Sequence, residues 1–429
     1  MLAAAPLLGA TAAHAAPPTT DTYTGGTGNW SGNSNWSLNA PPSANNIAVL
    51  TPTASGSVVV TLDVSTPNLS QFTIDATSGN SVTFSQAANT LNVSSDEVVG
   101  QSGGGSVLQS GGNNNIGGAL QMAIGSNSVS NYTLTNGLLA ISGGGEIIGN
   151  NGAANFIQSG GTHSINSALY LGFGTGASGH YSLTNGTMTV LGDEFIGNFG
   201  SGTFNQAGGT QTILTGLSIG AFSGSQGTMT LSGGSLSASN VYVGGSALGS
   251  GGTGNLIVSG GLLNVGSVLK VFSTAGNGLV LSGGTISTGS VDLSGNLSAF
   301  QWSTGTLQLN DPAGFTIGAG GPFGPLLNLT AGKSLVVVGP LTLNPGSVVA
   351  INGGAFTGNA VTNSGTINVV TGSSTLGSLT GTGNTTVGGG TGTAKVTLAN
   401  FAQGAITINS GGTLQVLAAT PTTRTRRPR

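Results

Sequence analysis

The chain lacks cysteine altogether and is almost free of charge. Of its 429 residues, 10 are Asp or Glu and 7 are Lys or Arg, which together make about 4 %, whereas ordinary soluble domains carry about 25 %. Without cysteine there is no disulfide, thiol nucleophile, zinc–cysteine site or iron–sulfur ligation. All four arginines lie within residues 424–429, so the rest of the chain holds only three lysines against ten acids. Nucleic acid is therefore excluded as an expected partner, because its phosphates need a basic surface.

Long apolar runs are missing as well. The sequence contains no stretch of about 18 consecutive apolar residues, so it predicts no membrane-spanning helix. Residues 2–10 form a short apolar stretch, and Ala13-His14-Ala15 follows as a small-x-small pattern typical of signal-peptidase cleavage. We therefore expect a secretory signal over residues 1–16 and a secreted or cell-surface protein.

Glycine, by contrast, is abundant, with 80 residues. It follows no strict three-residue period, which excludes a collagen-like chain, and many Val, Ile and Leu residues accompany it. So many apolar residues with so few charges predict a buried core rather than disorder.

A repeat of about 24 residues organises the chain. Turn triplets recur at steps of 25, 24, 25, 23, 25, 27 and 23 residues, beginning at Ser110, Thr135, Ser159, Thr184, Ala207, Ser232, Ser259 and Ser282. A second series keeps the same period at Gly100, Gly125, Gly149, Gly172, Gly197, Gly220 and Gly244. Alternate copies resemble each other most, since Gln109, Gln158 and Gln206 precede every second turn.

Each unit contains about three short strand-like pieces bounded by Gly, Asn or Ser, and helix signals are nearly absent. Three strands per repeat predict an all-β, right-handed parallel β-helix with ~24-residue coils, in which each coil adds one strand to each of three sheets. Glycine is expected at corners that need a positive φ. A β-propeller with blades of about 49 residues is the competing architecture, but the equivalence of the half-periods and the lack of a regular blade aromatic disfavour it.

The organisation predicted from these patterns has five parts. They are a signal peptide (1–16), an N-terminal capping or irregular β region (17–95), regular β-helix repeats (96–295), a degenerate β-helix continuation (296–418) and a basic tail (419–429).

The most specific polar signal is the set of three glutamates, which occupy one repeat phase at Glu97, Glu146 and Glu194. Two coils apart, they would stand about 9–10 Å from one another along one face. That arrangement suits an acid/base carboxylate pair or, with Asp96 and Asp193, a row of cation sites. The favoured interpretation is that the repeat was copied with its Glu in an outward strand position that deters aggregation.

Other candidate residues have similarly plain interpretations. His163 and His180 fall within one coil's length, but no third ligand has a fixed spacing, so we expect surface histidines. Lys270 is expected to point to solvent. Three tryptophans are expected to plug the ends of the apolar core rather than to stack on sugars, namely Trp30, Trp36 and Trp302.

Several sequence features together carry a family resemblance. They are the opening Gly28-Asn29-Trp30-Ser31-Gly32-Asn33-Ser34-Asn35-Trp36-Ser37, the repeated Leu-Thr-Asn-Gly and Gln-Ser-Gly-Gly-Thr turns, and Phe300-Gln301-Trp302-Ser303-Thr304-Gly305-Thr306-Leu307. The chain resembles autotransporter passengers, specifically autotransporter-associated β-strand repeat proteins, and the related repeat proteins with a PEP-type C-terminal sorting tail. The resemblance implies a β-helix displayed at a Gram-negative cell surface. Of the PEP-type tail, only the Arg cluster is recognised in this sequence, and the resemblance to autotransporters would imply a membrane barrel that we do not expect within these residues.

The function expected from all of this is structural or adhesive, without catalysis, cofactor or metal. Surface glycans and sister molecules are the expected partners. The alternatives are a carbohydrate-active β-helix enzyme of the polysaccharide lyase or hydrolase type, working through the face of Glu97, Glu146 and Glu194, and a fragment of a larger autotransporter passenger.

Overall fold

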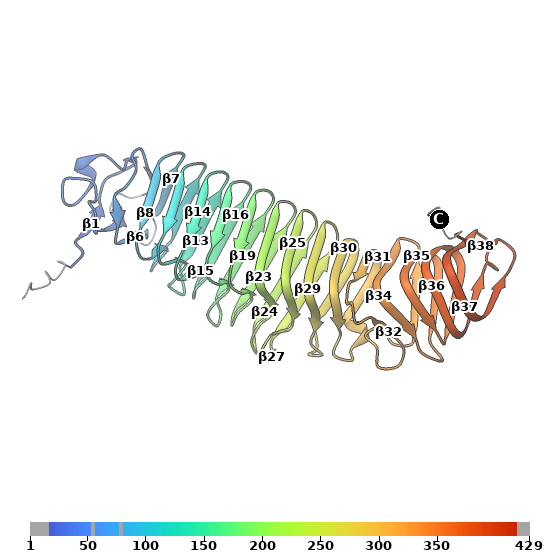
Figure 1. Cartoon of the computed structure of the whole chain (residues 1–429). Helices are drawn as coiled ribbons and strands as arrows, with labels where there is room; N and C mark the ends of the chain where they lie inside the picture. Colours follow the sequence, from blue (N-terminus) through green and yellow to red (C-terminus); the bar gives the residue numbers. More distant parts are fainter. Residues whose placement is uncertain (1–16, 53–55, 77–79, 418–429) are drawn as a thin grey trace, which may run out of the picture.

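A computed structural model describes residues 17–52, 56–76 and 80–417. The chain winds into an elongated parallel β-solenoid of about 16 turns with coils of about 24 residues (Figure 1). This confirms the predicted all-β solenoid, and its handedness stays a prediction. The predicted signal peptide and basic tail lie outside the described residues. In place of the antiparallel blades of a propeller, strands pair in parallel with the equivalent strand one coil away.

Three columns of stacked strands form the three faces of the solenoid. Face 1 begins with β2 (Gly28–Asn29), β4 (Ser57–Thr61), β7 (Ser81–Gln86), β10 (Gly105–Gln109), β13 (Val129–Leu134), β16 (Ala153–Gln158), β19 (Ser178–Leu183), β22 (Ser201–Gln206), β24 (Gln226–Leu231) and β28 (Thr253–Val258). Face 2 begins with β5 (Asn68–Leu69), β8 (Thr90–Val93), β11 (Asn113–Ile116), β14 (Leu138–Ile141), β17 (Thr162–Ile165) and β20 (Thr187–Val190). Face 3 begins with β1 (Thr20–Tyr23), β3 (Ile47–Leu50), β6 (Gln71–Ile74), β9 (Glu97–Val99), β12 (Ala119–Met122), β15 (Gly145–Ile148), β18 (Leu169–Leu171) and β21 (Glu194–Ile196).

Farther along, single strands bend around the corners and serve more than one face. They are β23 (Thr210–Ile219), β25 (Ser235–Val243), β29 (Leu262–Val271), β30 (Gly278–Asp292), β31 (Phe300–Leu309), β34 (Lys333–Leu343), β35 (Val348–Asn363), β36 (Thr366–Val387) and β37 (Ala394–Ile408). The remaining elements are shorter, namely β26 (Gly245–Ser246), β27 (Gly249–Ser250), β32 (Phe315–Ile317), β33 (Leu326–Thr330), β38 (Gly412–Val416) and the 3-10 turns η1 (Asn33–Asn35) and η2 (Leu297–Ala299). β26 and β27 form an antiparallel hairpin that projects from the solenoid.

The core runs along the inside of the solenoid, because alternate residues of each strand point inward. On face 1 the inward column includes a stack of rings whose centroids are 4.7–4.8 Å apart, formed by Tyr132, Phe156, Tyr181 and Phe204. That distance matches the separation of neighbouring strands, so equivalent side chains stack from coil to coil.

The corners behave largely as the glycine pattern predicts. The turn glycines adopt positive φ, for example 69° at Gly112 and at Gly161. The second series does so too, except that one corner falls on Ala123, with φ of 54°, and not on Gly125. Strand pairing explains why this corner falls on Ala123. Met122 pairs with Ile148, so the next residue, Ala123, aligns with Gly149.

The N-terminal end of the core is plugged by tryptophan, as predicted. Trp30 and Trp36 are buried with ring centroids 4.7 Å apart, and the Trp36 Nε1–H donates to the Trp30 carbonyl at 2.7 Å. Trp302 does not share this role. It is half-buried beside Phe300 in the part of β31 that precedes its pairing with β34, which begins only at Gly305.

Beyond β31 the coils become shorter. Equivalent inward positions on face 2 follow one another at steps of 21, 18, 22 and 18 residues, at Leu335, Phe356, Ser374, Val396 and Leu414. The final coil exposes side chains of its inward columns, including Phe401 (48 %) and Ile408 (52 %). No helix among the described residues has the length and apolar character needed to cross a membrane.

Candidate functional site

The three glutamates lie inside the solenoid, and their predicted outward position is wrong. Glu97, Glu146 and Glu194 each have no exposed surface. On face 3 they occupy one inward column, with Leu120 and Leu169 on the coils between them. The predicted separation of two coils is therefore correct, but the side chains point to the core.

Each glutamate is paired with a polar residue 17 positions later, which enters the core from face 2. Asn114 Nδ2 donates to Glu97 Oε2 at 2.9 Å, and Gln211 Nε2 donates to Glu194 Oε2 at 2.7 Å. In the middle copy, His163 Nε2 lies 3.2 Å from Glu146 Oε2. The pairing explains the burial, because a buried carboxyl group needs a hydrogen-bonding or charged partner.

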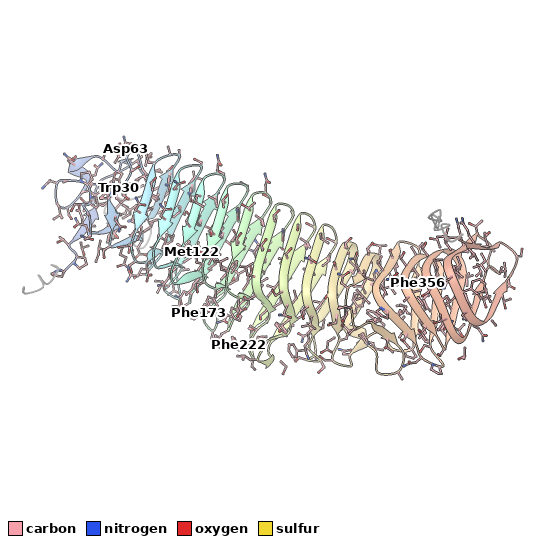
Figure 2. All side chains as sticks on the ribbon, viewed as in Figure 1. Trp30, Asp63, Met122, Phe173, Phe222 and Phe356 are labelled. Carbon is pink, nitrogen blue, oxygen red and sulfur yellow. The ribbon has the colours of Figure 1, made fainter. Side chains whose placement is uncertain are left out.

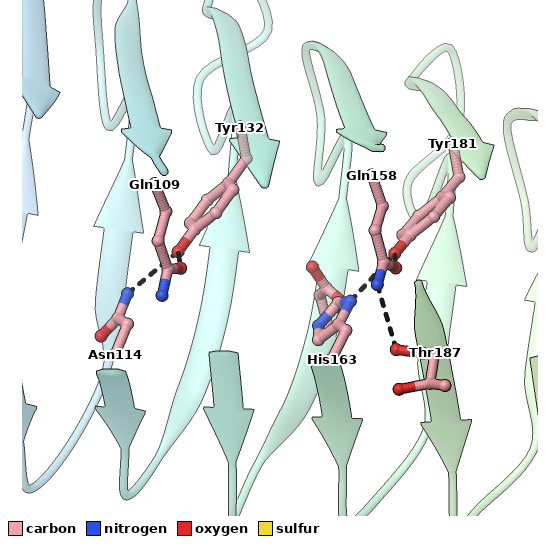
Figure 3. A network of polar contacts seen from close by, with 8 residues as sticks. Gln109, Asn114, Tyr132, Gln158, His163, Tyr181 and Thr187 are labelled. Atoms are coloured by element: carbon pink, nitrogen blue, oxygen red, sulfur yellow. Dashed lines mark hydrogen bonds and ion pairs between the residues drawn. The ribbon is translucent and has the colours of Figure 1, made fainter. Parts of the chain in front are cut away.

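The middle copy extends into a chain of four side chains, shown in Figure 3. The Tyr181 hydroxyl donates to Gln158 Oε1 at 2.6 Å, and its oxygen lies 3.0 Å from His163 Nδ1. Gln158 Nε2 in turn donates to the Thr187 carbonyl at 3.0 Å. The single phenolic proton of Tyr181 goes to Gln158. The hydrogen between the Tyr181 oxygen and His163 Nδ1 must therefore be on Nδ1.

The contact between His163 Nε2 and Glu146 Oε2 has the distance of an ion pair, but neither atom has a hydrogen-bonding partner among the described residues. Neither side chain has any exposed surface, so the core encloses the pair.

The first copy repeats the pattern with an amide in place of the imidazole. Asn114 Nδ2 also donates to the Tyr132 oxygen at 3.2 Å, and the Tyr132 hydroxyl donates to Gln109 Oε1 at 2.6 Å (Figure 3). In the third copy Met229 holds the tyrosine position, so Gln206 Oε1 has no partner among the described residues.

Burial shifts the acid–base behaviour of these groups. Desolvation raises the pKa of Glu97 to about 7 and that of Glu194 to about 8, and the bonds from Asn114 and Gln211 offset this only in part. Burial also raises the pKa of Tyr132 and Tyr181 well above the ordinary range. Oε1 of each glutamate meets no donor among the described residues, an arrangement that a neutral carboxyl tolerates better than a carboxylate.

These groups do not form a site for an external substrate. They are enclosed by the core, so a polymer has no access to them. The cation-site alternative also fails on geometry, because Asp96 and Asp193 point outward and accept backbone N–H bonds from Ala119 (2.8 Å) and Gly216 (2.9 Å). Within the described ranges, no three acidic or histidine side chains are grouped to hold a metal.

Two further predictions can be placed. His163 is fully buried, which corrects the surface interpretation, whereas His180 lies half-buried in an outward column of face 1, so the two are not brought together. Lys270 points outward as predicted, but it also pairs with Asp292 at 2.7 Å.

The buried hydrogen-bond network leaves a signal in the sequence that the 24-residue repeat alone does not reveal. Gln109, Gln158 and Gln206 recur visibly in the repeat, but the partners of the three glutamates differ from copy to copy. The constant offset of 17 residues from each Glu to Asn114, His163 or Gln211 would have identified them.

Away from the buried network, the described residues also form a groove on the outer surface. A groove of about 520 Å³ lies on face 3 beneath the β26–β27 hairpin, and we call it the Ser218 groove. Its lining includes Asp193, Phe195, Ser218, Asn240, Tyr242 and Leu248.

Comparison with known proteins gives no family assignment. No protein-family model matches the chain, and neither the curated proteins nor the solved structures give a significant match.

Proposed function

We propose that the protein is an exported, cell-surface or extracellular solenoid with a structural and adhesive role and without catalytic activity. The observation that carries the proposal is the division of polar groups between core and surface. The repeated acids are consumed in core hydrogen bonds, whereas the outer surface presents hydroxyl and amide side chains.

Ladders of outward amides illustrate this surface. Asn115 donates to Asn92 at 3.0 Å on face 2, and Asn155 donates to Asn131 at 3.2 Å on face 1. Each of these pairs joins two neighbouring coils and presents amide donors and acceptors on a nearly uncharged surface. A solenoid of this kind can engage an extended partner through many weak contacts.

The enzyme alternative loses its candidate residues. A polysaccharide lyase or hydrolase acting through Glu97, Glu146 and Glu194 would need those carboxyl groups on an accessible face, and all three are buried. Relationship to autotransporter passengers or to PEP-type sorted proteins remains part of the proposal, supported by the solenoid and by the sequence features that carry the resemblance.

Self-association is the second mode of action that the structure favours. In the last coil, inward-column residues such as Ile408 and Val416 are about half exposed. An uncovered strand edge with apolar side chains is a template for pairing with another strand. Light scattering over a range of protein concentrations would show whether this end joins sister molecules.

Localisation tests the proposal as a whole. An antibody against residues 100–290 would be used on fractionated producing cells and on intact cells treated with protease. Detection at the outer surface, with loss of signal after protease treatment, is the expected result. Protein confined to the cytoplasm would overturn the proposal.

A further inference from the structure

The Ser218 groove lies where an aromatic column on the outside of face 3 is interrupted. Strand pairing places Tyr170, Phe195, Ser218 and Tyr242 at successive outward positions of this column. The rings of Tyr170 and Phe195 stack with centroids 5.1 Å apart and an interplanar angle of 3°. Ser218, with only 4 % of its surface exposed, stands where the next ring would be, so Phe195 and Tyr242 are separated by two coil spacings, or about 9–10 Å.

A second group of rings borders the same gap. Phe222 stacks on Phe199 with centroids 4.8 Å apart and lies 6.3 Å from Phe195. Figure 2 shows Phe222 on the edge of the solenoid from which the β26–β27 hairpin projects in Figure 1. Leu248, in the hairpin loop, is 88 % exposed. The groove therefore has an apolar wall, and the hairpin overhangs it.

Polar groups line the opposite side. Asp193 Oδ1 accepts the Gly216 N–H at 2.9 Å, and no donor among the described residues reaches its Oδ2. Asn240 Oδ1 accepts the Val268 N–H at 3.4 Å, while its amide nitrogen has no protein acceptor within the described ranges. The backbone bonds orient both side chains and leave one acceptor atom and one donor group for a ligand.

We infer that the Ser218 groove binds a sugar ring of an uncharged polysaccharide, which takes the place of the missing aromatic rung beside Phe195 and hydrogen-bonds to Asp193 and Asn240. This inference rests on the proposed adhesive function and gives it a site and a ligand class.

The shape and chemistry of a pyranose ring fit this combination. Such a ring has an apolar C–H face, which packs on an aromatic face, and a rim of hydroxyl groups, which bond to carboxylate and amide groups. A purely aromatic ligand would leave Asp193 and Asn240 unused.

Charge selects among polysaccharides. Asp193 is the only charged residue in the lining of the groove. Lys270, at the outward position beside Tyr242, is already paired with Asp292 at 2.7 Å. A polyuronate or sulfated glycan would be repelled by Asp193 without a compensating cation. The favoured ligand is therefore a neutral chain.

The test is affinity electrophoresis and titration calorimetry of the full-length protein with hydroxyethyl cellulose, xyloglucan and polygalacturonate. The expected result is binding to at least one neutral polymer and none to polygalacturonate. Phe195→Ala should weaken that binding about tenfold by removing the stacking face, and Asp193→Asn should weaken it about fivefold.

Ser218→Phe is the decisive variant, because it restores the missing rung and should block the groove while the solenoid stays intact. Ile157→Ala is the matched control, since it removes an exposed apolar side chain (44 %) from face 1, away from the groove, and should leave binding unchanged. Circular dichroism and thermal unfolding would establish that each variant is folded.

The experiments distinguish failure of the sugar-binding groove from failure of the proposed surface location. No binding to either neutral polymer, or binding that survives Ser218→Phe and Phe195→Ala, would overturn the groove assignment and leave the surface proposal to the localisation experiment. Tighter binding of polygalacturonate, or binding of only a tyrosine-containing peptide at the groove, would overturn the ligand class.

Discussion

His163 Nε2 and Glu146 Oε2 lie 3.2 Å apart in a core where neither side chain has any exposed surface. The coils on either side place apolar residues at the equivalent positions, with Leu120 and Leu169 flanking the glutamate and Leu139 flanking the histidine. The buried pair thus belongs to two columns in which polar and apolar residues alternate from coil to coil, because Glu97 with Asn114 and Glu194 with Gln211 occupy the same columns two coils away.

This setting predicts strong coupling between the two side chains. His163→Leu would leave Glu146 buried without its partner and should lower the free energy of unfolding by about 3–5 kcal/mol. The double variant with Glu146→Leu removes both polar groups and should recover most of that loss. Guanidinium unfolding of the two single variants and the double variant would measure the coupling. A loss in the double variant equal to the sum of the losses in the two single variants would show that the pair is not coupled.

A pH dependence follows from the other two glutamates. In the folded chain the pKa of Glu97 is raised to about 7 and that of Glu194 to about 8 by desolvation, from an ordinary value of 4.5. The unfolded chain loses these protons from about pH 4.5, whereas the folded chain keeps that of Glu97 to about pH 7 and that of Glu194 to about pH 8. Stability should therefore be greatest near pH 4.5 and fall as the pH rises toward 8, by roughly 4 kcal/mol for Glu194 alone.

Unfolding midpoints measured from pH 5 to pH 9 would check this dependence. Glu194→Gln stays neutral at every pH, so its profile should be flatter than that of the unmodified protein. Asp193→Asn is the matched control, because the neighbouring acid is exposed and its replacement should leave the slope unchanged. A slope that Glu194→Gln does not reduce would contradict the assignment.

In the ring stack of face 1, some positions require a hydroxyl group and neighbouring positions exclude one. Tyr181→Phe would remove the donor to buried Gln158 Oε1 and should cost about 1–3 kcal/mol of stability. Phe156→Tyr is the converse change. It would place a hydroxyl in the core next to Leu134, which holds the glutamine position on the preceding coil, and should also destabilise. Chemical unfolding of both variants would test the alternation, and stability gained by Phe156→Tyr would contradict it.

The sequence was sufficient for the architecture because the determinants of the coil are local. Corners need glycine with positive φ, and three short strands separate the corners, so the repeat predicts the solenoid. The orientation of Glu97 was predicted wrongly because a charged residue was assigned to the surface on its own chemistry. The strand period gave the opposite answer, since Val99 faces the core and Glu97, two residues earlier, must point the same way.

The partners of the glutamates depend on a different level of structure. Asn114 and Gln211 lie on another face, and only the winding of the coil brings them to Glu97 and Glu194. The Ser218 groove was likewise beyond a sequence reading. It depends on which outward positions stack across coils, and Ser218 is conspicuous only once Phe195 and Tyr242 are aligned with it.

Two glycines with nearly the same backbone conformation provide the last test. Gly149 has φ of 77° and Gly176 has φ of 81°. A Cβ at Gly149 would overlap the Ser178 carbonyl of the next coil, whereas a Cβ at Gly176 would meet no atom within 4 Å. Gly176→Ala should therefore cost only the backbone strain of about 1–2 kcal/mol, and Gly149→Ala should cost more because coil stacking must also shift. Thermal unfolding of both variants would separate the two contributions, and equal losses would show that close approach of the coils is not what requires glycine at position 149.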